Sequence, residues 1–208
     1  MLTVGPLQEN CFLLRRDGSD RAVIVDPGDE AARLLGTVDE LGVTLEAILL
    51  THAHFDHVGA VAEIARATGT EVWVPRIEAP VLADINSYVL FPGFGPYEGY
   101  AAEHVLDGGE TLSLAGLTIE VLSTPGHSPG HVTFSVPDEQ VVFSGDVLFQ
   151  GSVGRTDLPG GDTGTLMESI RTLFEGLPAE TKVYPGHMGL TTLGDERARN
   201  PFLTALSG

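Results

Sequence analysis

Residues 51–57 read Thr51-His52-Ala53-His54-Phe55-Asp56-His57, and they directly follow the apolar run Ala47-Ile48-Leu49-Leu50. Three histidines and one aspartate therefore fall within six consecutive residues, just after an expected buried strand. Neutral imidazole nitrogens and carboxylate oxygens are good ligands for zinc-like ions, and few structural roles need so many of them in one turn. The stretch predicts a divalent metal site.

Three isolated candidates later in the chain extend this site. Each stands in a glycine-containing turn after an expected strand: Gly126-His127, Gly145-Asp146 and Gly186-His187. Together with the first stretch they supply seven ligands, which is enough for two metals that share a bridge. Because His52 and His54 project the same way in an extended turn, they can serve one metal, while Asp56 and His57 serve another.

Length and composition limit the number of domains and the class of protein. A chain of 208 residues with 42% hydrophobic content is expected to form a single domain over residues 1–208 with a real core. No apolar run approaches the length of a membrane span, and the first residues do not resemble a signal peptide. The lone cysteine, Cys11, lies in a strand-like run and is expected to be a buried structural thiol in a reducing cytoplasm.

The charge balance excludes one class of partner. Only 11 Lys and Arg face 29 Asp and Glu, which gives a net charge of −18. A nucleic-acid-binding protein needs a basic footprint, and none is visible here. We therefore expect a small-molecule substrate that is not a polyanion, with no nucleic-acid or membrane partner, and the sequence leaves the oligomeric state open.

The pattern of elements predicts an α/β (α+β) fold. Two similar β-rich halves are each flanked by helical segments, including one expected over residues 57–68, and this describes a four-layer αββα sandwich. Residues 85–100 break the pattern with aromatics among glycines and prolines. They form either a loop packed by its own rings or a flap over a pocket. Candidate substrate contacts there are Tyr88, Phe91, Phe94 and Tyr97.

With these residues in place, the chain resembles the metallo-β-lactamase superfamily over nearly its full length. The resemblance rests on His52-x-His54-x-Asp56-His57, followed by His127, Asp146 and His187. It implies the αββα fold and two divalent metal ions. Zinc is the first expectation for these ions, and iron and manganese are also compatible with the ligands. It further implies one metal on His52, His54 and His127, a second on Asp56, His57 and His187, and Asp146 bridging both. Asp56 and Asp146 are then the catalytic carboxylates, acting on a water activated between the metals.

Two further segments narrow the branch. Residues 151–162, which include Gly154-Arg155-Thr156-Asp157, and residues 185–202 resemble the short bacterial forms of the glyoxalase II-like hydrolases. This likeness implies hydrolysis of a thioester such as S-lactoylglutathione. Full-length members carry a helical C-terminal domain that contacts glutathione, and we expect this chain to lack it. Met188 stands where the family commonly has Gly or Asp.

Four residues are expected to support the ligands from behind. They are Asp26, Arg155, Asp157 and His131. For Asp26 this role is implied by the resemblance, and a plain turn explains the residue equally well. For Arg155 and Asp157 the alternative is a surface ion pair.

Other branches of the superfamily remain as alternatives. Persulfide dioxygenases share a similar sequence motif and bind a single Fe(II) through two histidines and one aspartate. In this chain these ligands would be His52 or His54, together with His127 and Asp146. A metal-binding protein without turnover is the non-enzyme alternative. Most zinc β-lactamases have Cys at the position of Asp146 and a secretion signal, so they are disfavoured.

Overall fold

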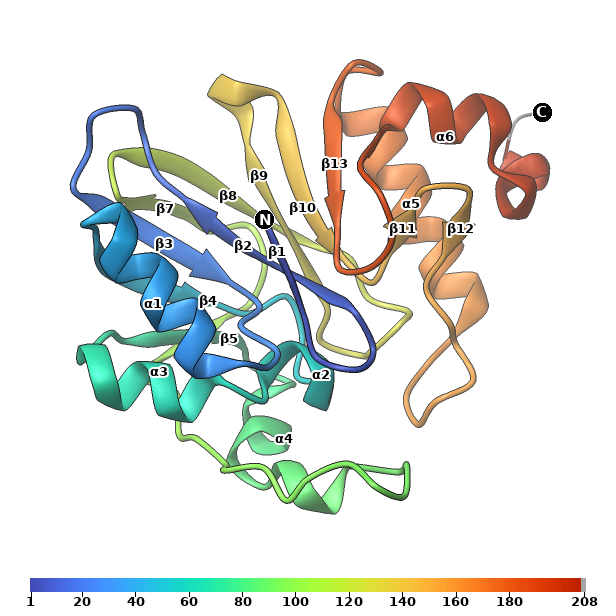
Figure 1. Ribbon diagram of the computed structural model, residues 1–208. Helices are drawn as coiled ribbons and strands as arrows, with labels where there is room; N and C mark the ends of the chain where they lie inside the picture. The colour runs from blue at the N-terminus through green and yellow to red at the C-terminus, as the bar shows by residue number, and fades with distance from the viewer. Residues whose placement is uncertain (207–208) are drawn as a thin grey trace. The chain divides into compact units, whose positions relative to one another are not determined.

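The computed structural model describes residues 1–206, which divide into two compact units. The first unit contains residues 1–107 and 112–117, and the second contains residues 108–111 and those from 118 onward. The chain forms two six-stranded sheets, and each unit has its own helices and its own apolar core (Figure 1). Among the described residues, no helix combines the length and apolar composition needed to cross a membrane.

The sheet of the first unit runs in chain order from β1 to β6. Its strands are β1 (Leu2–Val4), β2 (Glu9–Leu14), β3 (Arg21–Val25), β4 (Thr44–Leu49), β5 (Val72–Pro75) and β6 (His104–Leu106). The first two pairs are antiparallel, and from β3 onward neighbours are parallel. Parallel neighbours end at the same edge of a sheet, so the segments after β3 and β4 emerge side by side.

Helices α1 (Ala31–Leu41) and α3 (Val61–Thr68) cover one face of this sheet (Figure 1). Leu34 and Val38 lie one turn apart on α1 and are both buried, as is Ile64 on α3. Cys11 is fully buried in the same core. Burial raises the pKa of its thiol, and the carboxylates of Glu9 and Asp26 raise it further. The predicted structural thiol is confirmed, because a buried neutral thiol is a poor nucleophile.

The helix expected over residues 57–68 is wrong as a single element. The structure has a short helix α2 (Phe55–Val58) and then α3, which begins at Val61. Between them Ala60 donates its backbone N–H to the carbonyl of Pro27 at 3.1 Å. A Cβ at Gly59 would lie 2.4 Å from the backbone oxygen of Gly28. The helix is therefore interrupted because residues 59 and 60 pack against the loop after β3.

The aromatic region contains only short helical pieces. Helix α4 (Ala79–Ala83) and the 3₁₀ turn η1 (Ile85–Ser87) are followed by residues 88–103, which form no helix or strand within the described chain. Asn86 closes this loop, since its side chain accepts from the N–H of Tyr97 at 2.9 Å and donates to the carbonyl of Tyr97 at 2.7 Å. The irregular backbone predicted for this region is confirmed, and the choice between a self-packed loop and a flap stays open.

The second sheet has the order β14-β13-β10-β9-β8-β7, and apart from residues 112–117 it belongs to the second unit. Its strands are β7 (Thr111–Leu114), β8 (Leu117–Ser123), β9 (Val132–Val136), β10 (Val141–Gly145), β13 (Lys182–Pro185) and β14 (Thr191–Thr192). β10 is antiparallel to β9 and parallel to β13. The small hairpin of β11 (Leu148–Phe149) and β12 (Ser152–Val153) leads away from β10.

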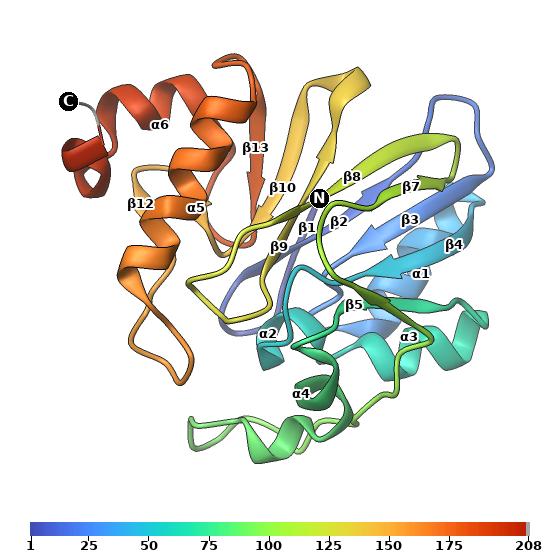
Figure 2. The same cartoon turned by 180° about the vertical axis from the view of Figure 1, so that it is seen from behind.

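Helices α5 (Thr163–Gly176) and α6 (Leu193–Arg199) run beside β13 and β10 (Figure 2). The 3₁₀ turns η2 (Pro137–Glu139) and η3 (Pro201–Leu206) complete the unit. Leu166, Ile170 and Leu173 of α5 follow a helical period and are buried with Val142 and Val183 of the sheet.

Candidate metal centre

Every candidate ligand follows the end of a strand. β4 ends at Leu49 before His52, β8 at Ser123 before His127, β10 at Gly145 before Asp146, and β13 at Pro185 before His187. The placement expected from the sequence is confirmed for all four turns.

In the first unit, Asp26 fixes the loop that carries the histidines. It is almost fully buried and follows β3 with a positive φ of 49°, a conformation that aspartate tolerates. Its carboxylate accepts the backbone N–H of Thr51 at 2.8 Å and the hydroxyl of Thr51 at 2.6 Å. The same carboxylate accepts Nδ1–H of His57 at 3.0 Å. One side chain thereby holds both ends of the turn.

These bonds also fix the tautomers of two histidines. Since the hydroxyl proton of Thr51 is directed at Asp26, its oxygen accepts Nδ1–H of His52 at 3.0 Å. His52 and His57 are both protonated at Nδ1, so that each keeps its Nε2 lone pair for another partner. A carboxylate or hydroxyl behind the far nitrogen is the arrangement that metal-binding histidines use.

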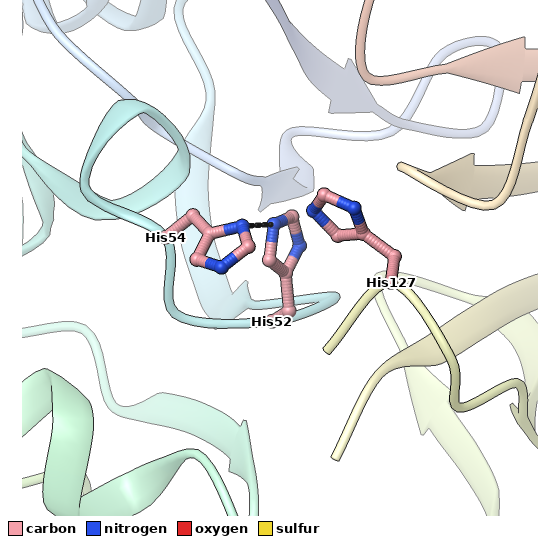
Figure 3. A group of neighbouring side chains, drawn as sticks. All are labelled: His52, His54 and His127. Carbon is pink, nitrogen blue, oxygen red and sulfur yellow. Dashed lines mark hydrogen bonds between the residues drawn. The ribbon is translucent and has the colours of Figure 1, made fainter. Parts of the chain in front are cut away.

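His52 and His54 face each other across a short gap. Nε2 of His52 lies 3.1 Å from Nδ1 of His54 (Figure 3). Figure 3 also labels His127, which belongs to the loop after β8 of the second unit. Two nitrogens bound to one tetrahedral zinc at 2.0–2.1 Å would be about 3.3 Å apart. The observed separation therefore suits a pair of ligands on one ion.

Asp56 and His57 occupy the first turn of α2, for which His54 is the N-cap residue. His57 is fully buried, whereas Asp56 is half-buried. The loop after β3 presses against their backbone, since a Cβ at Gly28 would lie 1.7 Å from the carbonyl oxygen of Asp56. Glycine is thus required at position 28 by close approach. Asp26, His52 and His57 also form a geometric cluster, but Asp26 is already engaged by Thr51 and His57 and supports the ligands.

In the second unit, Asp146 lies between two histidines. Its Oδ2 is 3.5 Å from Nε2 of His127 and 3.6 Å from Nε2 of His187. These separations are too long for hydrogen bonds and match the spacing of ligand atoms around a common ion. The parallel neighbours β10 and β13 bring Asp146 and His187 together, and Gly186 donates its N–H to the carbonyl of Gly145 at 2.8 Å.

The backbone of residues 154–155 positions His127. Nδ1–H of His127 donates to the carbonyl oxygen of Arg155 at 2.8 Å, which leaves its Nε2 lone pair toward Asp146. A Cβ at Gly154 would lie 1.8 Å from the carbonyl oxygen of Asp146 and 3.3 Å from Nδ1 of His127. Close approach of the backbone therefore requires glycine at position 154 in the second unit, as it does at position 28 in the first.

His131 supports Asp146 and is not a ligand in this arrangement. Its Nε2 accepts the backbone N–H of Asp146 at 3.1 Å, and its Nδ1–H donates to the hydroxyl of Thr124 at 3.1 Å. Both ring nitrogens are engaged and the ring is fully buried. His131 contacts Asp146 through the backbone, and its predicted role in supporting the ligands stays a prediction.

Arg155 and Asp157 bond to each other at the surface. Nε and Nη2 of Arg155 donate to the two carboxylate oxygens of Asp157 at 2.7 and 2.8 Å. Their side chains are 52% and 68% exposed. Arg155 reaches His127 through its backbone oxygen, so the support expected from its side chain stays a prediction.

Sequence reasoning missed a buried carboxylate in the second unit. Glu196 of α6 accepts the N–H of Gly151 at 2.8 Å, the hydroxyl of Thr191 at 2.6 Å and the amide of Asn200 at 2.8 Å. Asn200 also donates to the carbonyl of Ser152 at 2.9 Å. Together they anchor the β11–β12 hairpin between Asp146 and Arg155. The signal was present, because these residues lie in the C-terminal segment that resembles the glyoxalase II-like hydrolases.

The donor set fits divalent metal ions of the zinc class. Imidazole nitrogens and carboxylate oxygens are the ligand atoms that these ions prefer. In His52, His57 and His127 the Nδ1 nitrogen is hydrogen-bonded, which leaves Nε2 for a metal. His52 with His54, and Asp146 with His127 and His187, already stand at ligand-to-ligand distances.

The comparisons with known proteins agree with this chemistry. The family description "Metallo-beta-lactamase superfamily" matches residues 4–187. Hydroxyacylglutathione hydrolase GloC of Haemophilus influenzae is 39% identical, over 100% of this chain and 98% of its own length. Among solved structures, the BLEG-1 B3 metallo-β-lactamase superposes with a TM-score of 0.91 at 42% identity, covering 97% of both chains. A di-iron-bound form of TTHA1623 gives 0.89 at 44% identity, covering 97% of this chain and 98% of its own.

Proposed function

Because the chain belongs to the metallo-β-lactamase superfamily, we propose that it is a metal-dependent hydrolase that cleaves thioesters. The superfamily and the fold imply divalent metals and a small-molecule substrate. The choice of a thioester is supported by the relative named as a hydroxyacylglutathione hydrolase, which matches this chain from end to end.

The proposed ligand sets follow the pattern of the superfamily. His52, His54 and His127 would hold one metal, Asp56, His57 and His187 the other, and Asp146 both. The observation that carries this proposal is the position of Asp146, with one oxygen 3.5 Å from His127 and 3.6 Å from His187. A carboxylate that only paired with one histidine would lie at hydrogen-bond distance from it.

The residues around the site have separate tasks in this proposal. Divalent ions bound there would supply an activated water at neutral pH and polarise the substrate carbonyl. Asp56, half-buried at the start of α2, would hold one of these ions and orient that water as a hydrogen-bond acceptor. Asp26, the carbonyl of Arg155 and His131 keep the ligands in place before substrate arrives. Water adds to the carbonyl carbon, the carbon–sulfur bond breaks, and a carboxylic acid and a thiol leave.

One purified sample tests the proposal. We expect two metal ions per chain by elemental analysis together with hydrolysis of S-lactoylglutathione. One iron per chain, oxygen uptake on glutathione persulfide and no thioester cleavage would instead place the protein among the persulfide dioxygenases. Bound metal without any turnover would leave a metal-binding protein.

β-Lactam hydrolysis is a second candidate, favoured by the likeness to a protein named as a B3 metallo-β-lactamase. The same sample should be offered a chromogenic cephalosporin. Turnover of the β-lactam in preference to the thioester, measured as kcat/KM, would replace the first candidate with the second.

A further inference from the structure

The imidazole of His187 packs against an aromatic ring. The ring of Phe149 lies 5.9 Å from that of His187, between centroids, and the two planes stand at 90°. Perpendicular aromatic pairs at this distance attract each other and have a preferred orientation. Phe149 is almost fully buried, whereas the side chain of His187 keeps 20% of its surface exposed. The contact therefore restrains the more exposed of the two rings.

A second contact restrains the loop that carries His187. A Cβ at Gly189 would lie 2.7 Å from the side-chain oxygen of Gln150, the residue that follows Phe149. Gln150 stands at the turn of the β11–β12 hairpin, between its two strands. This hairpin thus packs against the loop after β13 at two points, the imidazole and the backbone two residues further on.

The hairpin that carries Phe149 is held on both sides of the ring. Before it, the buried hydroxyl of Ser144 donates to the carbonyl of Leu148 at 3.0 Å. After it, the buried carboxylate of Glu196 in α6 accepts the N–H of Gly151 at 2.8 Å (Figure 1). Phe149 therefore stands on a supported element, which is what a residue needs in order to fix the position of another.

The orientation of an imidazole decides whether it can bind a metal. The lone pair of Nε2 lies in the plane of the ring, so rotation about the bond to Cβ moves it away from the ion. For three other candidate ligands a hydrogen bond at Nδ1 restrains this rotation, and they are His52, His57 and His127. At His187 the ring of Phe149 opposes it, while Nε2 lies 3.6 Å from Oδ2 of Asp146.

We propose that Phe149 is a positioning residue for His187 and thereby sets the affinity of the metal ion bound there. The inference rests on the ligand sets of the proposed function and adds a residue that is not itself a ligand. In this role Phe149 acts only through the orientation of the imidazole. Loss of its ring should weaken the ion at His187 and leave the other ion in place.

The test measures the two zinc dissociation constants of the metal-loaded protein by stepwise competition with a chelator. Phe149→Leu keeps an apolar side chain and removes the ring. We expect about tenfold weaker binding of one zinc ion and an unchanged constant for the other. With Co²⁺ in place of zinc, the visible absorption of that one ion should shift, because this absorption depends on the geometry of the ligands.

Phe143→Leu is the matched control. Phe143 is buried to the same extent in the same unit, and its ring lies 5.2 Å from that of Tyr184, which is not a candidate ligand. This variant also loses one aromatic pair from the interior. It should lower the free energy of unfolding, as Phe149→Leu does, and should change neither zinc constant.

His187→Ala separates the possible outcomes, because it should lose one zinc ion of two. If it does so while Phe149→Leu leaves both constants unchanged or weakens both equally, the positioning role is overturned and the proposed function stands. An equal effect of Phe143→Leu on the zinc constants would also overturn the role. Two zinc ions in His187→Ala would refute the ligand set and the inference together. The expected constants without thioester cleavage would refute the thioester function alone.

Discussion

The two units hold their candidate ligands in different ways. In the first unit four of them lie within residues 52–57, and a single side chain, Asp26, bonds to both ends of that turn. In the second unit the ligands come from three loops between residues 127 and 187, and strand pairing together with backbone carbonyls sets their positions. A local cluster depends on a few strong contacts, whereas a scattered set depends on the whole sheet behind it.

The largest effect should come from Asp146→Ala. This change removes the carboxylate that faces both His127 and His187, so most bound metal and all hydrolysis should be lost. The loss should exceed the roughly 10–100-fold that is typical for a residue behind a ligand. Elemental analysis and kcat/KM measure it, with Asp138→Ala, an exposed aspartate of the same unit, as control. Two metals and full turnover in the variant would refute the bridging role.

Asp26→Ala should have the next largest effect and tests the local half of the comparison. Without the carboxylate, Thr51 and His57 lose a shared acceptor, and the histidine tautomers are no longer fixed. Metal affinity, measured by competition with a chelator, should fall about 10–100-fold. Asp20→Ala removes an equal charge at an exposed site and should leave the affinity unchanged. An unchanged affinity in Asp26→Ala would make Asp26 a plain turn residue.

Matched glycine substitutions compare the two units directly. A Cβ at Gly28 would meet the carbonyl of Asp56, and one at Gly154 would meet the carbonyl of Asp146. Gly28→Ala and Gly154→Ala should each lower the free energy of unfolding by about 1–3 kcal/mol, as overpacking does. Gly36→Ala, in α1 with open space at its Cβ, should instead raise it by about 0.5–1 kcal/mol. Denaturant unfolding gives all three values. An unchanged free energy of unfolding for the substitution at position 154 alone would mean that the backbone of the second unit can relax around an added methyl group, whereas that of the first cannot.

This contrast explains what the sequence could predict. The fold class is confirmed by the family match and by the superposition on solved metallo-β-lactamase folds. The cluster at residues 52–57 was visible because its ligands are adjacent, and the later ligands were visible because each follows a strand with a glycine turn. The break between α2 and α3 was not visible, because it comes from the packing of Gly59 and Ala60 on a loop far away in sequence. Propensity alone favoured one continuous helix there.

The hydrogen bonds that hold the loops of the second unit were also not predictable from the sequence. Glu196 lies beyond the last ligand in sequence, and its role depends on bonds to Gly151 and Asn200 that no spacing rule predicts. Met188 is a smaller case. Its φ of 69° lies in the left-handed region, which favours glycine over a side chain such as methionine.

The smallest effect should come from Arg155→Ala, which separates a side-chain role from a backbone role. The Arg155 guanidinium holds the pKa of the Asp157 carboxyl down to about 2, from an ordinary value of 3.8. A lowered folded-state pKa contributes stability that is present above pH 3.8 and is lost as the pH falls through about 2. The difference in Tm between wild type and variant should therefore be small at neutral pH, shrink with added salt, and vanish near pH 2. Metal affinity should not change, because the carbonyl oxygen that accepts from His127 remains in alanine. A tenfold loss of metal affinity in this variant would instead give the exposed side chain a part in the site, and the second unit would then depend on local contacts as the first does.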